Sequence, residues 1–234
     1  VKRFGQNTVC DGVNLTVQQG QMVCLIGASG AGKSTLLRCI NLLEAIEEGA
    51  IFLDGEDISI PGLNPQHVRA KIGMVFQNFN LFPHMTAFEN TMLAPKRVHG
   101  LPKAQLHSEI ETLFESFELA DRMHNYPDQL SGGQQQRVAT VRALAMKPEV
   151  MLFDEITSAL DPQLVGDVLD VLLKLKNQGM TMILATHEME FARQAADKVC
   201  FLKDGKIIEE GTSQQIFGTP KKSETKAFLA RALK

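Results

Sequence analysis

Apolar runs of strand length alternate along this chain with segments whose apolar residues recur every three or four positions. The runs lie at residues 22–26, 72–76, 150–153 and 180–185, and the segments between them have the periodicity of amphipathic helices. Continuous apolar runs of this length are typical of parallel strands that are buried on both faces of a sheet. We therefore predict an α/β fold whose core is a mainly parallel sheet covered by helices.

Shorter β patterns flank these runs and predict an additional antiparallel β subdomain. Residues 13–17 alternate between apolar and polar side chains, which predicts a half-buried strand. The dipeptides Asp54-Gly55 and Asp204-Gly205 each separate two short apolar runs, and Asp-Gly is a common turn sequence of β-hairpins. We also expect a strand at the start of the chain, with Val1 already inside it.

The middle of the chain has a different pattern. Between residues 86 and 146 the β-branched runs disappear, and helical spacing such as that of Ile110 and Phe114 replaces them. We predict that residues 86–146 form an α-helical subdomain. It is inserted into a core formed by residues 1–85 and 147–234, all within a single domain.

Composition narrows the classes of partner. The chain has 234 residues and a formal net charge of -3, which argues against the basic surface that nucleic-acid binding needs, so we expect no nucleic-acid partner. No apolar run approaches the length of a membrane span. The four cysteines are scattered, without the spacing of a zinc site or a disulfide framework, which fits a reducing cytosol.

The most specific motif is a glycine loop that follows the first apolar run and leads into a segment with helical spacing. Backbone N–H groups of such a loop and of the following helix N-terminus attract phosphate oxygens, a lysine adds a positive charge, and a serine hydroxyl can ligate Mg²⁺. The candidate nucleotide-binding residues are Gly27, Ala28, Ser29, Gly30, Ala31, Gly32, Lys33, Ser34 and Thr35. The alternative is a glycine turn with a chance lysine; the order strand, loop, helix favours binding of a nucleoside triphosphate.

Polar side chains follow the other three apolar runs: Gln77 the second, Asp154 and Glu155 the third, and Thr186-His187 the fourth. Because the carboxyl ends of parallel strands meet at one edge of a sheet, we expect them beside the glycine loop. Asp154 and Gln77 suit Mg²⁺ or its water shell. Glu155 would face an attacking water, and His187 can bond a γ-phosphate. The alternatives are a helix N-cap for the acidic pair, a strand-ending residue for Gln77 and a structural role for His187.

A second glycine-opened helix begins at residues 131–134, Ser-Gly-Gly-Gln. We predict that this helix buries Val138 and Val141 and places residues 135–137 on its polar side. Its N-terminus is another anion site, yet the chain has one acidic pair and one lysine-bearing loop. The economical interpretation is that it meets the phosphates of a nucleotide held by a second copy of the chain; the alternative is a helix start that meets only water.

Together, the glycine loop, Gln77, residues 131–134, the acidic pair, residues 158–161 and His187 resemble the ATP-binding subunits of ABC transporters over essentially the whole chain. The resemblance implies the ABC ATPase fold and ATP with Mg²⁺ as ligands. The implied metal ligands are Ser34, Gln77 and Asp154. The implied catalytic residues are Glu155 as general base, Gln77 and His187. The residues implied to bind nucleotide in trans are Ser131, Gly132, Gly133, Gln134 and Asp161, and Phe4 stands where the family stacks an aromatic ring on adenine.

Residues 126–129, 134–137 and 186–192 are similar to the polar amino acid importers of bacteria. This resemblance implies an ATP-sandwich homodimer, integral membrane permease subunits as partners, and a substrate-binding protein indirectly. It also implies a peripheral location on the cytoplasmic face of the inner membrane. Ile156 departs from the family's usual proline after the acidic pair, and we expect altered turn rigidity rather than lost activity.

The loop at residues 78–86 is unusually apolar, which is typical of a docking site. In the family this region meets cytoplasmic helices of the membrane partner; a buried hinge is the alternative. Two other functions compete with the transporter motor. A soluble ATPase that acts on DNA or ribosomes predicts inserted modules or basic surfaces, and a small-molecule kinase leaves residues 131–134 and His187 without a role.

Overall fold

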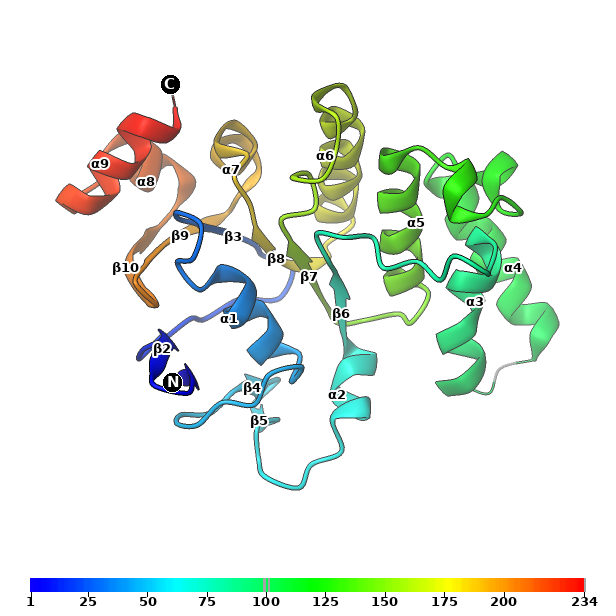
Figure 1. The fold of residues 1–234 in the computed structure, drawn as a ribbon, viewed down its shortest axis with the longest axis horizontal. Helices are drawn as coiled ribbons and strands as arrows, with labels where there is room; N and C mark the ends of the chain where they lie inside the picture. Colours follow the sequence, from blue (N-terminus) through cyan, green and yellow to red (C-terminus); the bar gives the residue numbers. More distant parts are fainter. Residues whose placement is uncertain (99, 101, 234) are drawn as a thin grey trace.

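The computed structural model describes residues 1–98, 100 and 102–233. Within them, a central six-stranded sheet has the order β10-β9-β3-β8-β7-β6 (Figure 1). The strands are β3 (Met22–Ile26), β6 (Ile72–Val75), β7 (Val150–Asp154), β8 (Thr181–Ala185), β9 (Lys198–Lys203) and β10 (Lys206–Gly211). Neighbours from β9 to β6 are parallel, and β10 pairs with β9 in the antiparallel direction. The predicted α/β class and its mainly parallel sheet are confirmed.

Side chains of β3 alternate between two hydrophobic cores, one on each face of the sheet. Met22, Cys24 and Ile26 belong to the larger core, which also contains the apolar side chains of the helical region. Val23 and Leu25 belong to the smaller core on the opposite face. All five residues are fully buried, which explains why the sequence reads as a continuous apolar run rather than an alternating one.

The helices surround this sheet. They are α1 (Lys33–Ile40), α2 (Pro65–Lys71), α3 (Ala87–Val98), α4 (Lys103–Ser116), α5 (Gly132–Leu144), α6 (Pro162–Asn177), α7 (Met189–Ala195), α8 (Ser213–Gly218) and α9 (Ser223–Ala232). Helices α3, α4 and α5 pack on one another beyond the β6 edge of the sheet, and short 3-10 turns at Ala120–Arg122 and Pro127–Gln129 connect α4 to α5 (Figure 1). In the described ranges, no helix has the length and hydropathy needed to cross a bilayer.

The antiparallel part lies near the N-terminus. Strand β1 (Lys2–Phe4) pairs with β2 (Asn7–Cys10), and β4 (Phe52–Leu53) pairs with β5 (Glu56–Asp57) across the predicted Asp54-Gly55 turn. The predicted Asp204-Gly205 hairpin is also present, between β9 and β10. Both turn aspartates adopt a left-handed backbone, with φ of 49°.

Two sequence-based expectations are wrong. Residues 13–17 alternate in burial as expected, but they form no strand, because their apolar side chains cover the smaller core without a ladder partner. Gln136, expected on the polar side of α5, is fully buried, and its side-chain amide has no hydrogen-bond partner among the described residues. The cause is that α5 is enclosed by α3, α6 and β6 and has little polar side left at this level.

Candidate functional site

The glycine loop emerges from the carboxyl end of β3 and leads into α1 (Figure 1). Lys33 is 3% exposed, and its Nζ donates to the carbonyl oxygens of Gly27 at 2.9 Å and Ala28 at 3.2 Å. Helix α1 begins without a side-chain cap or an acidic residue in its first turn. Its N-terminal N–H groups and partial positive charge are therefore available to an anion.

Two glycines allow this loop to lie close to its neighbours. Gly27 has a φ of +154°, and a Cβ atom there would lie 2.3 Å from the carbonyl oxygen of Leu202. Gly32 has a φ of +100°, and its Cβ atom would lie 2.7 Å from the carbonyl oxygen of Val9. Only glycine fits such conformations and approaches without strain, so the curvature of the loop depends on both residues.

Ser34 and Asp154 form a pair of adjacent oxygen donors. The Ser34 hydroxyl donates to Asp154 Oδ1 at 2.6 Å. Asp154 is 3% exposed at the end of β7, and burial raises its pKa above the ordinary value although the bond from Ser34 opposes this shift. Mg²⁺ prefers oxygen ligands of this kind, and a bound divalent cation would offset the desolvation of the carboxylate. The two side chains thus fit a magnesium site.

The raised pKa of Asp154 leads to a pH-dependent stability. Because its pKa is higher in the folded than in the unfolded chain, stability falls as pH rises from the ordinary value of 3.8 through the folded value. Asp154→Asn cannot ionise. We therefore expect the free energy of unfolding of this variant, minus that of the parent, to rise across this pH window and to stay constant above it.

Urea titrations in EDTA from about pH 4 to pH 7 measure this difference in the free energy of unfolding. The control is Asp170→Asn, which removes the same charge from an exposed position of α6 and is measured in parallel as the reference. A free-energy difference between Asp154→Asn and the parent that falls as pH rises would contradict the raised pKa of Asp154.

Glu155 is held where its carboxylate meets the glycine loop. Its Oε1 lies 3.2 Å from Lys33 Nζ and 3.0 Å from His187 Nε2. Its backbone is left-handed, with φ of 48°, and is fixed by a 2.9 Å bond from its N–H to the Ala185 carbonyl and by bonds from the Ser158 N–H and hydroxyl to its own carbonyl. A non-glycine residue in this region is strained by about 1–3 kcal/mol, so the surrounding structure determines its position.

The structure therefore brings Lys33, Ser34, Asp154, Glu155 and His187 together, as expected from their places after parallel strands. A further link, from the Thr157 hydroxyl to Glu188 Oε1 at 3.2 Å, joins the turn after β7 to the turn after β8. Neither a motif nor residue spacing indicates that link.

Gln77 and Phe4 are not part of this cluster. Gln77 is exposed beyond β6, and in the part of the chain that the structure describes its side chain bonds neither Ser34 nor Asp154. Phe4 is 48% exposed, and the Lys2 ammonium lies 4.6 Å from the centroid of its ring. The roles expected for these two residues stay predictions.

The Ser-Gly-Gly-Gln segment begins α5 with a reciprocal cap. The Ser131 hydroxyl accepts from the Gln134 N–H at 3.3 Å, and Gln134 Oε1 accepts from the Ser131 N–H at 2.9 Å. Asp161 caps α6 with a single bond, accepting from the Gln163 N–H at 3.0 Å. Figure 1 shows the start of α5 well away from α1, so one chain does not bring this segment to its own glycine loop.

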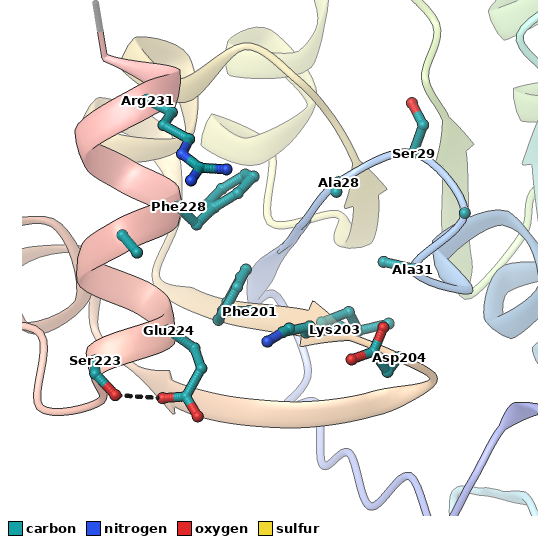
Figure 2. Close-up of a pocket in the computed structure, with 13 residues that line it drawn as sticks. Ala28, Ser29, Ala31, Phe201, Lys203, Asp204, Ser223, Glu224, Phe228 and Arg231 are labelled. Carbon is teal, nitrogen blue, oxygen red and sulfur yellow. Dashed lines mark hydrogen bonds between the residues drawn. The ribbon is translucent and has the colours of Figure 1, made fainter.

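A cleft of about 570 Å³ opens beside the glycine loop (Figure 2). It lies between the outer side of residues 28–31 and α9, over the rings of Phe201 and Phe228, whose centroids are 5.0 Å apart. Lys33, Asp154 and Glu155 do not line it. The cleft thus flanks the converging polar side chains and does not contain them.

Sequence reasoning also missed Arg142 and Asn90, which hold the loop after Gln77. Arg142 donates to the carbonyl oxygens of Phe79 and Asn80, at 3.0 and 2.6 Å. Asn90 accepts from the Phe82 N–H at 2.8 Å. The Arg142 contacts join segments that are about 60 residues apart, and the Asn90 contacts join a loop to the helix that follows it. Neither periodicity nor a motif indicates them.

Known proteins resemble this chain along most of its length. A family model described as ABC transporter matches residues 10–158. The glutamine transport ATP-binding protein GlnQ of Geobacillus stearothermophilus is 47% identical over 99% of this chain and 96% of that protein. The glutamate transport ATP-binding protein GluA of Corynebacterium glutamicum is 49% identical over the same shares. A solved dimeric, post-hydrolysis structure of the ATP-binding cassette MJ0796 with ADP and Pi is 35% identical, with a TM-score of 0.78 over 91% of this chain and 94% of that one.

Proposed function

Because this chain belongs to the ABC transporter family and is an ATP-hydrolysing subunit of it, we propose that it is the motor of an importer of polar amino acids. The observation that carries the motor role is the meeting of Lys33, Ser34, Asp154 and Glu155 at one edge of the sheet. The cargo class is supported by relatives named for glutamine and glutamate transport that are similar over nearly the whole chain.

ATP binds to the glycine loop. The N–H groups of the loop and of the first turn of α1 bond the phosphate oxygens, and Lys33 neutralises the β- and γ-phosphates. Lys33 now bonds two carbonyl oxygens of its own loop and Glu155, and a γ-phosphate competes with these weaker partners for the ammonium group. Phe4 stacks on the adenine ring. Binding therefore frees the Glu155 carboxylate from its contact with Lys33.

Ser34 and Asp154 would hold Mg²⁺, and Gln77, after β6, would add a further oxygen ligand. When bound, the ion neutralises charge that develops on the phosphate oxygens. The fit rests on the buried Asp154 carboxylate, whose oxygen lies 2.6 Å from the Ser34 hydroxyl. Its desolvation outweighs the opposing effects of that hydrogen bond and of the charges of Arg38 and Lys33, so its pKa stays raised.

Glu155 takes the proton of the attacking water. Its backbone is fixed on both sides, so its carboxylate is oriented before the substrate arrives. His187 bonds the γ-phosphate and keeps the carboxylate in position. Two observations support this role: its Nε2 lies 3.0 Å from Glu155 Oε1, and it follows the neighbouring strand β8.

A second copy completes the site. Ser131, Gly132, Gly133 and Gln134 present the N-terminus of α5 to the γ-phosphate held by the partner, and Asp161 lies beside this contact at the start of α6. The separation of α5 from α1 within one chain supports this arrangement, as does the dimeric state of the MJ0796 structure. Hydrolysis removes the attraction between the γ-phosphate and α5, and the dimer opens.

The membrane partner docks on residues 78–86, at the cytoplasmic face of the membrane. Phe82 is 42% exposed in this loop, an unusual position for a phenylalanine. Phe82→Asp should reduce ATP-driven transport by about tenfold or more, because a buried charge at the centre of an interface is strongly unfavourable. ATP hydrolysis by the isolated chain should stay unchanged.

The measurement compares transport by reconstituted complexes with hydrolysis by the isolated chain. Phe52→Asp, at a 65% exposed position of β4, is the matched control and should affect neither. Equal loss of transport and hydrolysis in Phe82→Asp would instead favour a buried hinge at this loop.

The cargo is tested with the membrane complex that co-purifies with a tagged form of this chain. Reconstituted in vesicles with ATP on the side of the chain and the cognate binding protein on the other, it should accumulate labelled glutamine or glutamate and not leucine. Uptake of apolar amino acids or sugars alone would overturn the cargo assignment and leave the motor role intact.

A further inference from the structure

Arg142, near the end of α5, holds the backbone that follows Gln77. Its Nη1 donates to the Asn80 carbonyl at 2.6 Å and its Nη2 to the Phe79 carbonyl at 3.0 Å. Burial lowers the pKa of Arg142, with no acidic neighbour to oppose the shift. A half-buried guanidinium whose partners are two consecutive carbonyls, and no carboxylate, acts to fix a backbone.

The same segment touches the other end of α5. A Cβ atom at Gly132 would lie 3.7 Å from Phe79 Cζ, so the ring of Phe79 lies against the backbone of the first helical turn. Side chains on a helix point toward its N-terminus, so Arg142 reaches back along α5 to meet the carbonyl of that residue. Within the described residues, no other hydrogen bond ties residues 77–81 to a neighbouring element.

The second half of the loop is fastened to a different helix. Asn90 of α3 is 1% exposed; its side chain accepts from the Phe82 N–H at 2.8 Å and donates to the carbonyls of Phe82, Met85 and Thr86 at 3.0–3.2 Å. Residues 82–86, the docking half of the loop, are therefore attached to α3 and should move with it. Residues 79–80, next to Gln77, are attached to α5.

We infer that Arg142 is a positioning residue that couples the position of Gln77 to that of α5, so that the two move together. This inference rests on the proposed function, in which Gln77 serves the ATP of its own chain and residues 131–134, at the start of α5, meet the ATP of the partner. A displacement of α5 against the partner's nucleotide then passes through Arg142 and Phe79 to Gln77. One guanidinium thus links the two nucleotide contacts of the chain.

A double-mutant cycle on the full chain tests the link. The four proteins are the parent, Arg142→Leu, Gln77→Ala and the double variant, and kcat and KM for ATP with Mg²⁺ are measured for each. We expect Arg142→Leu to lower kcat by about tenfold in the parent, with KM little changed, and by about twofold or less in the Gln77→Ala background. The effect disappears because the residue through which Arg142 acts is already missing.

The control is Arg137→Leu, on the same helix, which removes a 3.3 Å bond to the Phe117 carbonyl and an ion pair with Glu118, both outside the loop after Gln77. Any effect of Arg137→Leu on kcat should be equal in both backgrounds. If Arg142→Leu does not fold, Arg142→Lys, which keeps one donor to one carbonyl, enters the same cycle.

The inference would be overturned if Arg142→Leu lowered kcat equally in the parent and in the Gln77→Ala background. It would also be overturned if Arg142→Leu did not lower kcat in the parent. A parent that does not hydrolyse ATP, or a Gln77→Ala variant with full activity, would instead overturn the part of the proposed function on which the inference rests. The two failures are therefore distinguishable.

Discussion

Glu155→Gln should abolish turnover while leaving ATP binding intact. The substitution keeps the shape of the side chain and its contact with His187, but it removes the proton acceptor. A positioned general base contributes about 10²–10⁴-fold in rate, so kcat should fall by a factor in that range. ATP that is bound and not hydrolysed should hold two chains together, and the protein should elute as a dimer in ATP and as a monomer in ADP.

Steady-state hydrolysis and size-exclusion chromatography measure the two effects. Glu190→Gln, an exposed carboxylate at the start of α7, is the control and should hydrolyse ATP like the parent. Normal hydrolysis by Glu155→Gln would remove this residue from the role of base. Loss of both hydrolysis and ATP binding would point to a structural effect on the loop, through the contact between Glu155 and Lys33.

Gly27→Ala should have the second-largest effect, acting on both stability and ATP affinity. Its new methyl group would lie 2.3 Å from the carbonyl oxygen of Leu202, which is fixed in β9 and cannot move aside without breaking the sheet. We expect a loss of about 1–3 kcal/mol in the free energy of unfolding, because overpacking against backbone is poorly relieved. The displaced loop should also bind ATP about tenfold more weakly or worse.

Gly30→Ala separates the two causes of this effect. Gly30 also has a positive φ, of +79°, but a Cβ atom there meets nothing within 4 Å. It should therefore lose stability only through backbone strain, and less than Gly27→Ala in urea titrations. Equal losses in the two variants would show that the close approach to β9 does not set the conformation of the loop.

Much of the fold could be predicted because its strands are buried on both faces. A strand such as β3, which sends Met22 to one core and Val23 to the other, has no polar position, so its apolar run is visible in the sequence. The glycine loop was equally visible, since its chemistry depends on consecutive residues. Asp154, Glu155 and His187 were predicted to converge because parallel strands end at a common edge. The contact of Asp154 with Ser34 and those of Glu155 with Lys33 and His187 bear this out.

The remaining features depend on contacts that local patterns do not encode. Residues 13–17 alternate because one side of the segment covers a core, and the same alternation arises whether or not a neighbouring strand is present. Gln136 is fully buried although it is polar, because three elements enclose α5 there. Arg142 acts on carbonyl oxygens, which carry no sequence signal, and its partners lie about 60 residues away.

In the proposed function, the site for ATP hydrolysis is divided between two chains. Within one chain the start of α5 lies far from the glycine loop, so a covalent link from Ser131 to that loop must join different molecules. The native cysteines do not interfere, because all four are buried and burial raises the pKa of Cys24, Cys39 and Cys200 to about 12.

The most direct measurement therefore mixes two proteins in the Glu155→Gln background, one carrying Ser131→Cys and the other Ser29→Cys, and oxidises them with and without ATP and Mg²⁺. We expect a covalent dimer that contains one of each chain, formed in ATP and absent without it. Failure of ATP to produce any such mixed dimer would contradict the claim.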